Sequence, residues 1–354
     1  MGKQCCSLCL GERLFRVLDS NPWPVSSQAC CYCGSSNQKL VDIDRLPAYF
    51  EWARVIYQPT NDSDGEPLLS WLQRDWSLFS TLDDSQANQL LDDIFSDGTF
   101  NVLANRKPDS LENEKSSERW RELKEEIQHR NRWPISSPEN QPSLFEEVVN
   151  YLSRLDEWDI AECYYRARIH DSEKPFEIKD LGAPPREKAG HGRLNPAGIP
   201  YLYLASEKST AIAEVRPHPG QKVVTASFQF SAEETEGIRI ANLIHVAPLF
   251  SPFDYLEATP ILRIRDFQEM VREIAQEFSR PVRPDAAPYR YVPTQYLCEL
   301  LKRKGFDGVA YSSALSKGHN LVLFDPSRFF AQPESLQEHY VHGVQMQYET
   351  LKIS

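Results

Sequence analysis

The 354-residue chain lacks long hydrophobic runs. Its longest apolar stretches, such as Lys222 to Phe230 and Asn320 to Phe324, are far shorter than the roughly 20 residues that a membrane-spanning helix requires. It also lacks the basic start and following apolar segment of a secretory signal. These absences predict a cytoplasmic protein with no membrane partner.

Internal repeats are absent as well, and no single class of residue dominates. Hydrophobic residues make up 41% and charged residues 25% of the chain, which excludes a disordered or fibrous protein. A chain of this length exceeds what one compact domain usually contains, so we expect at least two domains.

Positive charge is scarce in the N-terminal half. The net charge is −12, and residues 1–160 contain 16 Lys and Arg against 27 Asp and Glu, whereas residues 161–354 contain 23 against 24. An acidic surface gains little free energy from counterion release on a polyphosphate, so we expect no nucleic-acid partner. A small substrate or a basic protein partner suits this composition better.

Cysteine is nearly absent outside the first 33 residues, which contain six of the eight. Two C-x2-C pairs lie there, separated by twenty residues: Cys6 with Cys9, and Cys30 with Cys33. Their spacing favours a structural Zn²⁺ knuckle within residues 1–40 over reduced, metal-free cysteines. Four thiolates leave no open position for a reacting water. The neighbouring Cys5 and Cys31 leave the choice of ligands open.

Residues 41–158 alternate helical patterns with polar breaks. Asp83 or Asp84 can cap one helix, and similar patterns run through Ser117 to Arg132 and Ser143 to Trp158. We therefore expect a mostly helical domain here.

After residue 158 the pattern changes to short β-type runs separated by Gly- and Pro-rich loops and by helices. The predicted strands are Cys163–Ile169, Tyr201–Ala205, Val223–Phe230, Ile238–Ile244, Gly308–Tyr311 and Leu321–Phe324. The predicted helices are Ser209–Val215, Pro260–Phe278 and Thr294–Lys304. We expect an α+β domain over residues 159–335 and a C-terminal tail over 336–354.

Two features of this region point to a site. Residues 182–198 are rich in Gly and Pro, which predicts a rigid, exposed loop of the kind that binds ligands, with Arg193 placed to meet an anion. Glu214 stands in an otherwise apolar helical stretch, where a lone carboxylate is costly unless it faces a cleft.

Short motifs in this half occur in an order that resembles the RES family. They are YRAR (Tyr165–Arg168), GRLNPAG (Gly192–Gly198), LYLA (Leu202–Ala205), AIAEV (Ala211–Val215), GVAYSS (Gly308–Ser313) and GHNLVLF (Gly318–Phe324). The resemblance covers residues 161–326, and the cysteine pairs with the helices after them are similar to the zinc-containing HEPN/RES N-terminal domain that precedes some members.

The resemblance implies a fold like that of ADP-ribosyltransferases and cleavage of NAD by hydrolysis or phosphorolysis. NAD is then the substrate, and inorganic phosphate a second one if the reaction is phosphorolysis. Protein ADP-ribosylation, or a sensing or interaction module with a degenerate site, are the alternatives. Many members are toxins held by an antitoxin, so the implied partners include an antitoxin, and a homo-oligomer is compatible with this picture.

The resemblance also implies site residues. Four are catalytic: Arg166, Tyr203, Glu214 and Ser313. Four more are candidates for substrate binding: Arg168, Arg193, Asn195 and Ser312. Because Arg166 and Arg168 lie two positions apart on one strand, they share a face, and either or both can line the cleft.

Each catalytic residue type suits cleavage of the nicotinamide N-glycosidic bond. The transition state is oxocarbenium-like, so it calls for a nearby carboxylate such as Glu214. The forked donors of Arg166 suit the pyrophosphate. Tyr203 offers a flat face for nicotinamide, and Ser313 can contact the ribose or the carboxamide.

Competing enzyme classes fit less well. A HEPN ribonuclease needs an Arg followed four to six residues later by a His, whereas seven residues separate Arg121 from His129. A thiol protease at Cys163 or Cys298 is also disfavoured, because Cys298 lies among leucines on a predicted helix. The Pro-rich segment Arg280 to Pro293 is an insertion that we expect to cover the cleft or hold a partner.

Overall fold

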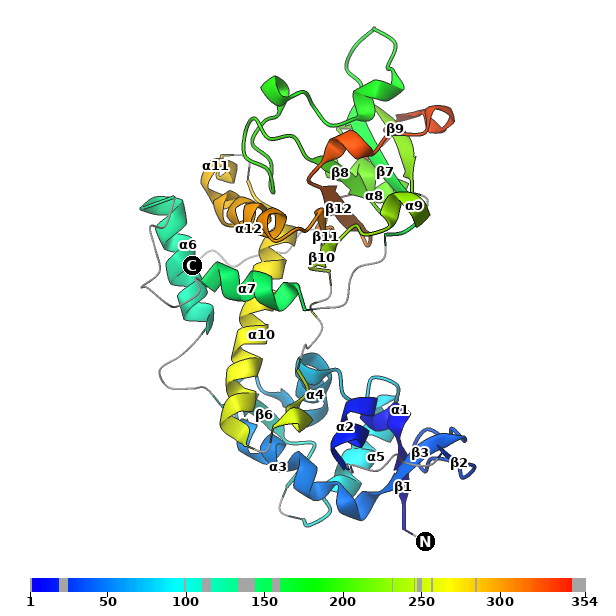
Figure 1. Ribbon diagram of the computed structural model, residues 1–354, viewed down its shortest axis with the longest axis vertical. Helices are drawn as coiled ribbons and strands as arrows, with labels where there is room; N and C mark the ends of the chain where they lie inside the picture. The colour runs from blue at the N-terminus through cyan, green and yellow to red at the C-terminus, as the bar shows by residue number, and fades with distance from the viewer. Residues whose placement is uncertain are drawn as a thin grey trace. The chain divides into compact units, whose positions relative to one another are not determined.

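A computed structural model of the chain divides into two compact units (Figure 1). Unit 1 comprises residues 1–120 and 247–271, and unit 2 comprises residues 121–246 and 272–354. The structure describes residues 2–18, 25–98, 100–109, 116–132, 144–154, 160–230, 232–244, 246, 250–255, 257–283 and 285–345. None of the described helices is long and apolar enough to cross a membrane.

Unit 2 is built on a mixed seven-stranded sheet in the order β10-β11-β12-β8-β7-β9-β13. The strands are β7 (Cys163–Ile169), β8 (Leu202–Ala205), β9 (Lys222–Gln229), β10 (Ile240–Asn242), β11 (Gly308–Ser312), β12 (His319–Leu323) and β13 (Gln337–Tyr340). The β10–β11 pair is parallel and the other pairs are antiparallel. The predicted α+β fold of this region is confirmed. β13 lies in the segment that the sequence analysis assigned to a tail, of which residues 346–354 are outside the described part.

The helices of unit 2 are α7 (Leu144–Leu152), α8 (Lys208–Glu214), α9 (Ala232–Thr235), α11 (Ala287–Arg290) and α12 (Val292–Arg303). Two more helices, α6 (Ser116–His129) and α10 (Ala258–Ser279), begin in unit 1 and end in unit 2. On one face of the sheet, Ala211 of α8 packs against Ala167, Ala205 and Val223. Because α8 is held there, its last residue, Glu214, lies beside β12, where it contacts Asn320.

Unit 1 is not mostly helical, so that prediction was wrong. Its helices are α1 (Ser7–Leu10), α2 (Glu12–Leu18), α3 (Pro47–Ile56), α4 (Leu68–Trp76), α5 (Asp84–Ile94) and the first part of α10. Two three-stranded sheets accompany them, one of β1 (Gln4–Cys6), β3 (Gln38–Asp42) and β2 (Val25–Ser26), the other of β4 (Tyr57–Pro59), β6 (Asn105–Pro108) and β5 (Glu66–Pro67). Strands of two to five residues are too short for alternation to reveal them.

The helices that were predicted in this half are nevertheless present. Asp83 caps α5, because its side chain accepts the backbone N–H of Gln86 at 2.8 Å. α6 overlaps the pattern predicted for Ser117–Arg132 and begins one residue before it, and α7 falls within the pattern predicted for Ser143–Trp158, of which residues 143 and 155–158 lie outside the described residues. The error therefore concerned the strands between the helices.

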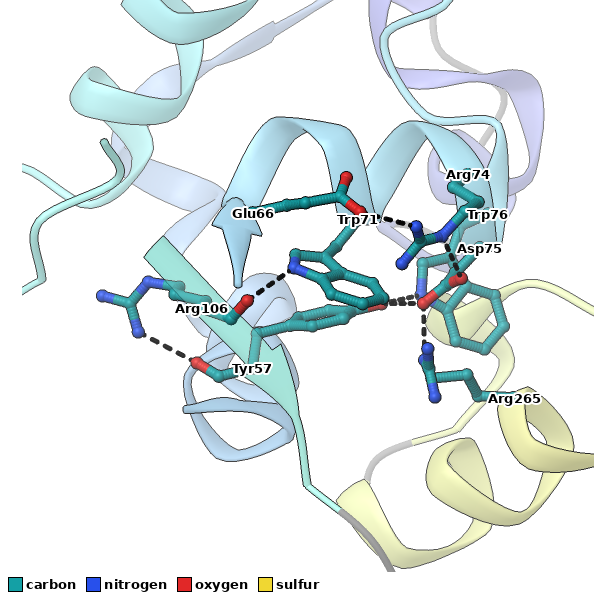
Figure 2. A network of polar contacts seen from close by, with 8 residues as sticks. All are labelled: Tyr57, Glu66, Trp71, Arg74, Asp75, Trp76, Arg106 and Arg265. Carbon is teal, nitrogen blue, oxygen red and sulfur yellow. Dashed lines mark hydrogen bonds and ion pairs between the residues drawn. The ribbon is translucent and has the colours of Figure 1, made fainter. Parts of the chain in front are cut away.

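A buried carboxylate joins segment 247–271 to the rest of unit 1 (Figure 2). Asp75 is fully buried and accepts hydrogen bonds from Arg265 Nε at 2.5 Å and from the Tyr57 hydroxyl at 3.0 Å. The Trp76 indole N–H donates in turn to Tyr57 Oη at 2.8 Å. Burial alone would lower the pKa of Arg265, but the Asp75 carboxylate raises it above its ordinary value. Unit 1 thus includes a segment that the sequence analysis placed within the α+β region.

Candidate active site

A pocket of about 570 Å³ lies in unit 2, beside the central strands β7, β8 and β12 and beside α8. Three of the four predicted catalytic residues line it, namely Arg166, Tyr203 and Glu214. Arg193, predicted as an anion-binding residue, lines it as well. The structure therefore gathers residues from motifs up to about 50 positions apart around one hollow.

Arg166 extends from β7 into this pocket. Its side chain is half-buried, and Nη1 donates to the backbone oxygen of Tyr203 at 3.0 Å. Burial, together with the neighbouring Arg168, lowers the pKa of Arg166 to about 9. Within the described part of the chain, no carboxylate pairs with Arg166. A cation held in this way favours an anionic ligand.

Arg193 is a second arginine at the pocket. Its Nη1 donates to the backbone oxygens of Arg280 at 2.6 Å and Glu277 at 3.4 Å, and its guanidinium carbon lies 5.3 Å from the centre of the Tyr291 ring. These contacts fix its position without neutralising its charge, because none of its partners among the described residues is a carboxylate.

Glu214 is exposed at the C-terminal end of α8. Its Oε1 accepts two hydrogen bonds, from Ser313 Oγ at 2.7 Å and from Asn320 Nδ2 at 2.8 Å. Ser313 follows β11 and Asn320 lies on β12, so two adjacent strands hold the carboxylate that the helix supplies. Both donors use the same oxygen, and Oε2 is not engaged by either of them.

Asn320 was missed by the sequence analysis. It is 5% exposed, it lines the pocket, and it lies directly beside Glu214. The motif GHNLVLF could have indicated this residue, because the amide of Asn320 directly precedes the apolar part of a predicted strand. A buried amide in such a position requires a polar partner.

Tyr203 and Asn195 hold the loop at the pocket entrance. The Tyr203 hydroxyl donates to Asn195 Oδ1 at 2.7 Å and accepts the backbone N–H of Leu194 at 3.1 Å. Asn195 is buried, and its Nδ2 reaches the backbone oxygen of Gly190 at 3.0 Å. A Cβ atom at Gly192 would collide with Asn195 Oδ1 and come within 3.0 Å of Tyr203 Oη, so this position requires glycine. Asn195 therefore supports the loop and does not line the pocket.

The two remaining candidates also lie off the pocket lining. Arg168 Nη2 donates to the backbone oxygen of Gly182 at 2.9 Å. Ser312 ends β11 and pairs with His319 of β12. Of the two arginines that share a face of β7, the structure brings Arg166 to the pocket.

A separate cluster lies in unit 1. The sulfur atoms of Cys6, Cys9, Cys30 and Cys33 all lie within 4.8 Å of one another, and the Cys6–Cys9 distance is 3.5 Å. An ion with tetrahedral Zn–S bonds of about 2.3 Å places its four sulfurs about 3.8 Å apart, which these distances match. Cys5 and Cys31 do not belong to this group. The four cysteines predicted from the spacing are thus compatible with a structural zinc site.

The fold and the motif order define an α+β domain with an arginine- and glutamate-lined pocket. The sequence profile of the RES domain matches residues 164–342, half of the chain, and the chain therefore belongs to the RES domain family. No curated protein matches the sequence. Among solved structures, the chain is similar to a chain of the M. tuberculosis MbcT–MbcA toxin–antitoxin complex, with 15% identity and a TM-score of 0.29 over 55% of this chain and 91% of that one.

Proposed function

We propose that this protein cleaves the nicotinamide N-glycosidic bond of NAD⁺, by hydrolysis or phosphorolysis, and thereby depletes NAD as a toxin or defence effector. One observation carries the proposal. The same pocket holds two arginines without carboxylate partners among the described residues and a glutamate fixed by two donors. NAD⁺ presents an anionic pyrophosphate and a ribose that becomes cationic, which is the matching charge pattern.

The arginines supply the binding end of the site. Arg166 uses one of its five N–H donors on Tyr203 O, so the rest of its fork is available for a pyrophosphate oxygen. Arg193 adds a second charge on the opposite loop. Holding the pyrophosphate fixes the position of the ribose before the bond breaks.

Glu214 supplies the reacting end. When the C–N bond breaks, its electron pair leaves on the nicotinamide nitrogen, which becomes neutral, and positive charge develops on the ribose. The Glu214 carboxylate stabilises that charge electrostatically. Ser313 and Asn320 both donate to Oε1, which fixes the carboxylate and leaves Oε2 as the oxygen that neither of them engages. Water or phosphate then adds to the ribose carbon, and the surplus proton passes to solvent.

Tyr203 contributes through its ring more than through its hydroxyl. Its Oη already donates to Asn195 and accepts from Leu194. The ring lines the pocket, where a flat face suits the nicotinamide.

We further propose that the four-cysteine cluster binds a structural Zn²⁺ and that an antitoxin protein restrains the catalytic unit. The zinc proposal rests on the sulfur distances. The antitoxin proposal rests on family membership, since many members of this family are held in that way.

The reaction is tested by following NAD⁺ and purified protein by ¹H NMR, with and without inorganic phosphate. Hydrolysis gives nicotinamide and ADP-ribose in both conditions, whereas phosphorolysis gives nicotinamide and ADP-ribose 1″-phosphate and requires phosphate. Label transferred from NAD⁺ to a protein would instead indicate ADP-ribosylation. NAD⁺ that stays intact in all conditions would refute the proposed activity.

A further inference from the structure

The insertion between β10 and β11 forms one wall of the NAD pocket. Val282, Ala287 and Tyr291 of this insertion line the pocket together with the residues of the RES motifs. They lie outside those motifs, in the Pro-rich segment that the sequence analysis expected to cover the cleft or hold a partner. The insertion therefore contributes to the site directly.

This wall is fastened to the pocket loop by buried side chains. Thr294 is 3% exposed and its Oγ1 donates to the backbone oxygen of Arg193 at 2.6 Å. Gln295 is 7% exposed and its Nε2 donates to the backbone oxygens of Gly192 at 2.7 Å and Asn195 at 3.1 Å. Such bonds hold Tyr291, directly before α12, in a defined place at the pocket.

Tyr291 stands in an arrangement typical of a site for a planar base. Its ring is stacked with that of His191, with centroids 6.4 Å apart and planes at 25°. The guanidinium carbon of Arg193 lies 5.3 Å from the centre of the Tyr291 ring. Tyr291 and His191 are both accessible from the pocket. Aromatic faces bind nucleobases by stacking, and an adjacent arginine suits the phosphate that follows the base.

The order of groups in NAD⁺ decides which base this is. Glu214 marks the place of the ribose that is cleaved, and the nicotinamide is attached to that ribose. The pyrophosphate comes next, and the adenosine lies beyond it. The proposed function assigns the pyrophosphate to Arg193 and the nicotinamide to the Tyr203 ring. Because Tyr291 contacts Arg193, the base beside Tyr291 is then the adenine of the far half of the substrate.

We propose that Tyr291, supported by His191 and Arg193, binds the adenine nucleotide of the substrate and makes this protein selective for NAD⁺ over nicotinamide mononucleotide. This inference rests on the proposed function, since it assigns one end of the same substrate. It adds a specificity residue that comes from the insertion of this chain.

The test compares Tyr291→Ala with Tyr291→Phe, using NAD⁺ and nicotinamide mononucleotide as substrates. Loss of the ring lowers kcat/KM for NAD⁺ about tenfold, as expected for one lost base–aromatic stack, and leaves kcat/KM for the mononucleotide unchanged. Tyr291→Phe keeps the ring and stays within about twofold of the wild type. Tyr289→Ala is the matched control, because Tyr289 is in the same segment but contacts His129 and does not line the pocket.

Equal losses on both substrates, or no loss on either, would overturn the adenine assignment. Binding is measured separately by titrating ADP-ribose into the wild type and Tyr291→Ala, where about tenfold weaker binding is expected. If the wild type cleaves neither substrate, the proposed activity fails, and the ADP-ribose titration alone decides the subsite. Unchanged ADP-ribose affinity in Tyr291→Ala would then refute it.

Discussion

At the scale of single residues, the site depends on how one carboxylate is held. Glu214 is exposed on a short helix, and Ser313 and Asn320 both donate to its Oε1. A flexible side chain oriented by two fixed donors reacts from a defined geometry, which reduces the cost of reaching the transition state. Asn320 is therefore a positioning residue in this account.

Replacement of Asn320 tests that role. Asn320→Ala removes one of the two donors to Glu214, so we expect kcat to fall about tenfold with little change in KM. Asn320→Asp replaces the donor with a carboxylate that repels Glu214, so we expect kcat to fall further than in Asn320→Ala. Steady-state kinetics of both variants measures these effects, and a wild-type kcat in Asn320→Asp would contradict the contact.

The choice between the two arginines of β7 is also testable. Arg166 lines the pocket whereas Arg168 donates to Gly182 O, so Arg166→Lys should raise KM for NAD⁺ about tenfold through loss of the forked donors. Arg168→Lys should have the smaller effect. The reverse order in KM would mean that Arg168 is the pyrophosphate ligand.

At the scale of elements, local patterns predicted unit 2 well and unit 1 poorly. β9 has the sequence KVVTASFQ and is buried at its six inner positions, and its small, β-branched and aromatic residues are typical of a strand that is covered on both faces. The strands of unit 1 are too short to show a period. Residues 247–271 could not be assigned either, because periodicity predicts a helix but not which core it joins.

The sequence predicted some residues of the candidate site and missed the role of others. Motif order located Arg166, Tyr203 and Glu214, which do meet at one pocket. It did not show that Asn195 is buried, because its bonds depend on the folded shape of the loop at residues 190–203. It did not show that Tyr291 lines the wall either, because that depends on contacts between segments about 100 residues apart.

Segment 247–271, which the sequence did not assign to unit 1, supports a stability prediction through the contact of Arg265 with the buried Asp75. Arg265→Met removes the cation that lies against Asp75 Oδ2 and leaves the more distant Arg74 Nε, 3.7 Å from Oδ1, and the loss of one member of a buried pair costs about 3–5 kcal/mol. We expect chemical denaturation of the purified variant to show unit 1 unfolding at lower denaturant concentration. The double variant Asp75→Asn/Arg265→Met removes both charges and should recover part of the loss. A single variant as stable as the wild type would contradict the network in Figure 2.

At the scale of the whole molecule, the cysteine cluster and the pocket belong to different units. Cys6, Cys9, Cys30 and Cys33 lie in unit 1, and the pocket lies in unit 2. Because four thiolates fill its coordination sphere and leave no position for a reacting water, the zinc that we propose acts on folding and takes no part in the chemistry.

Metal analysis tests this division. We expect one zinc ion per chain in the wild type and its loss in Cys6→Ser/Cys30→Ser, with a lower thermal stability, because the free energy of zinc binding stabilises the folded state. Cys31→Ser is the control, since this exposed cysteine is outside the cluster and should leave the zinc content unchanged. Wild-type protein that purifies without any metal would rule the site out.

The central claim is that the pocket of unit 2 breaks the nicotinamide N-glycosidic bond through Glu214. Nicotinamide release from NAD⁺, followed by ¹H NMR, measures it directly in the wild type, in Glu214→Gln and in Glu207→Gln, an exposed glutamate beside the start of the same helix. We predict release by the wild type and by Glu207→Gln, and a rate at least about a hundredfold lower in Glu214→Gln. Equal release by Glu214→Gln and the wild type, or no release by the wild type, would contradict the account.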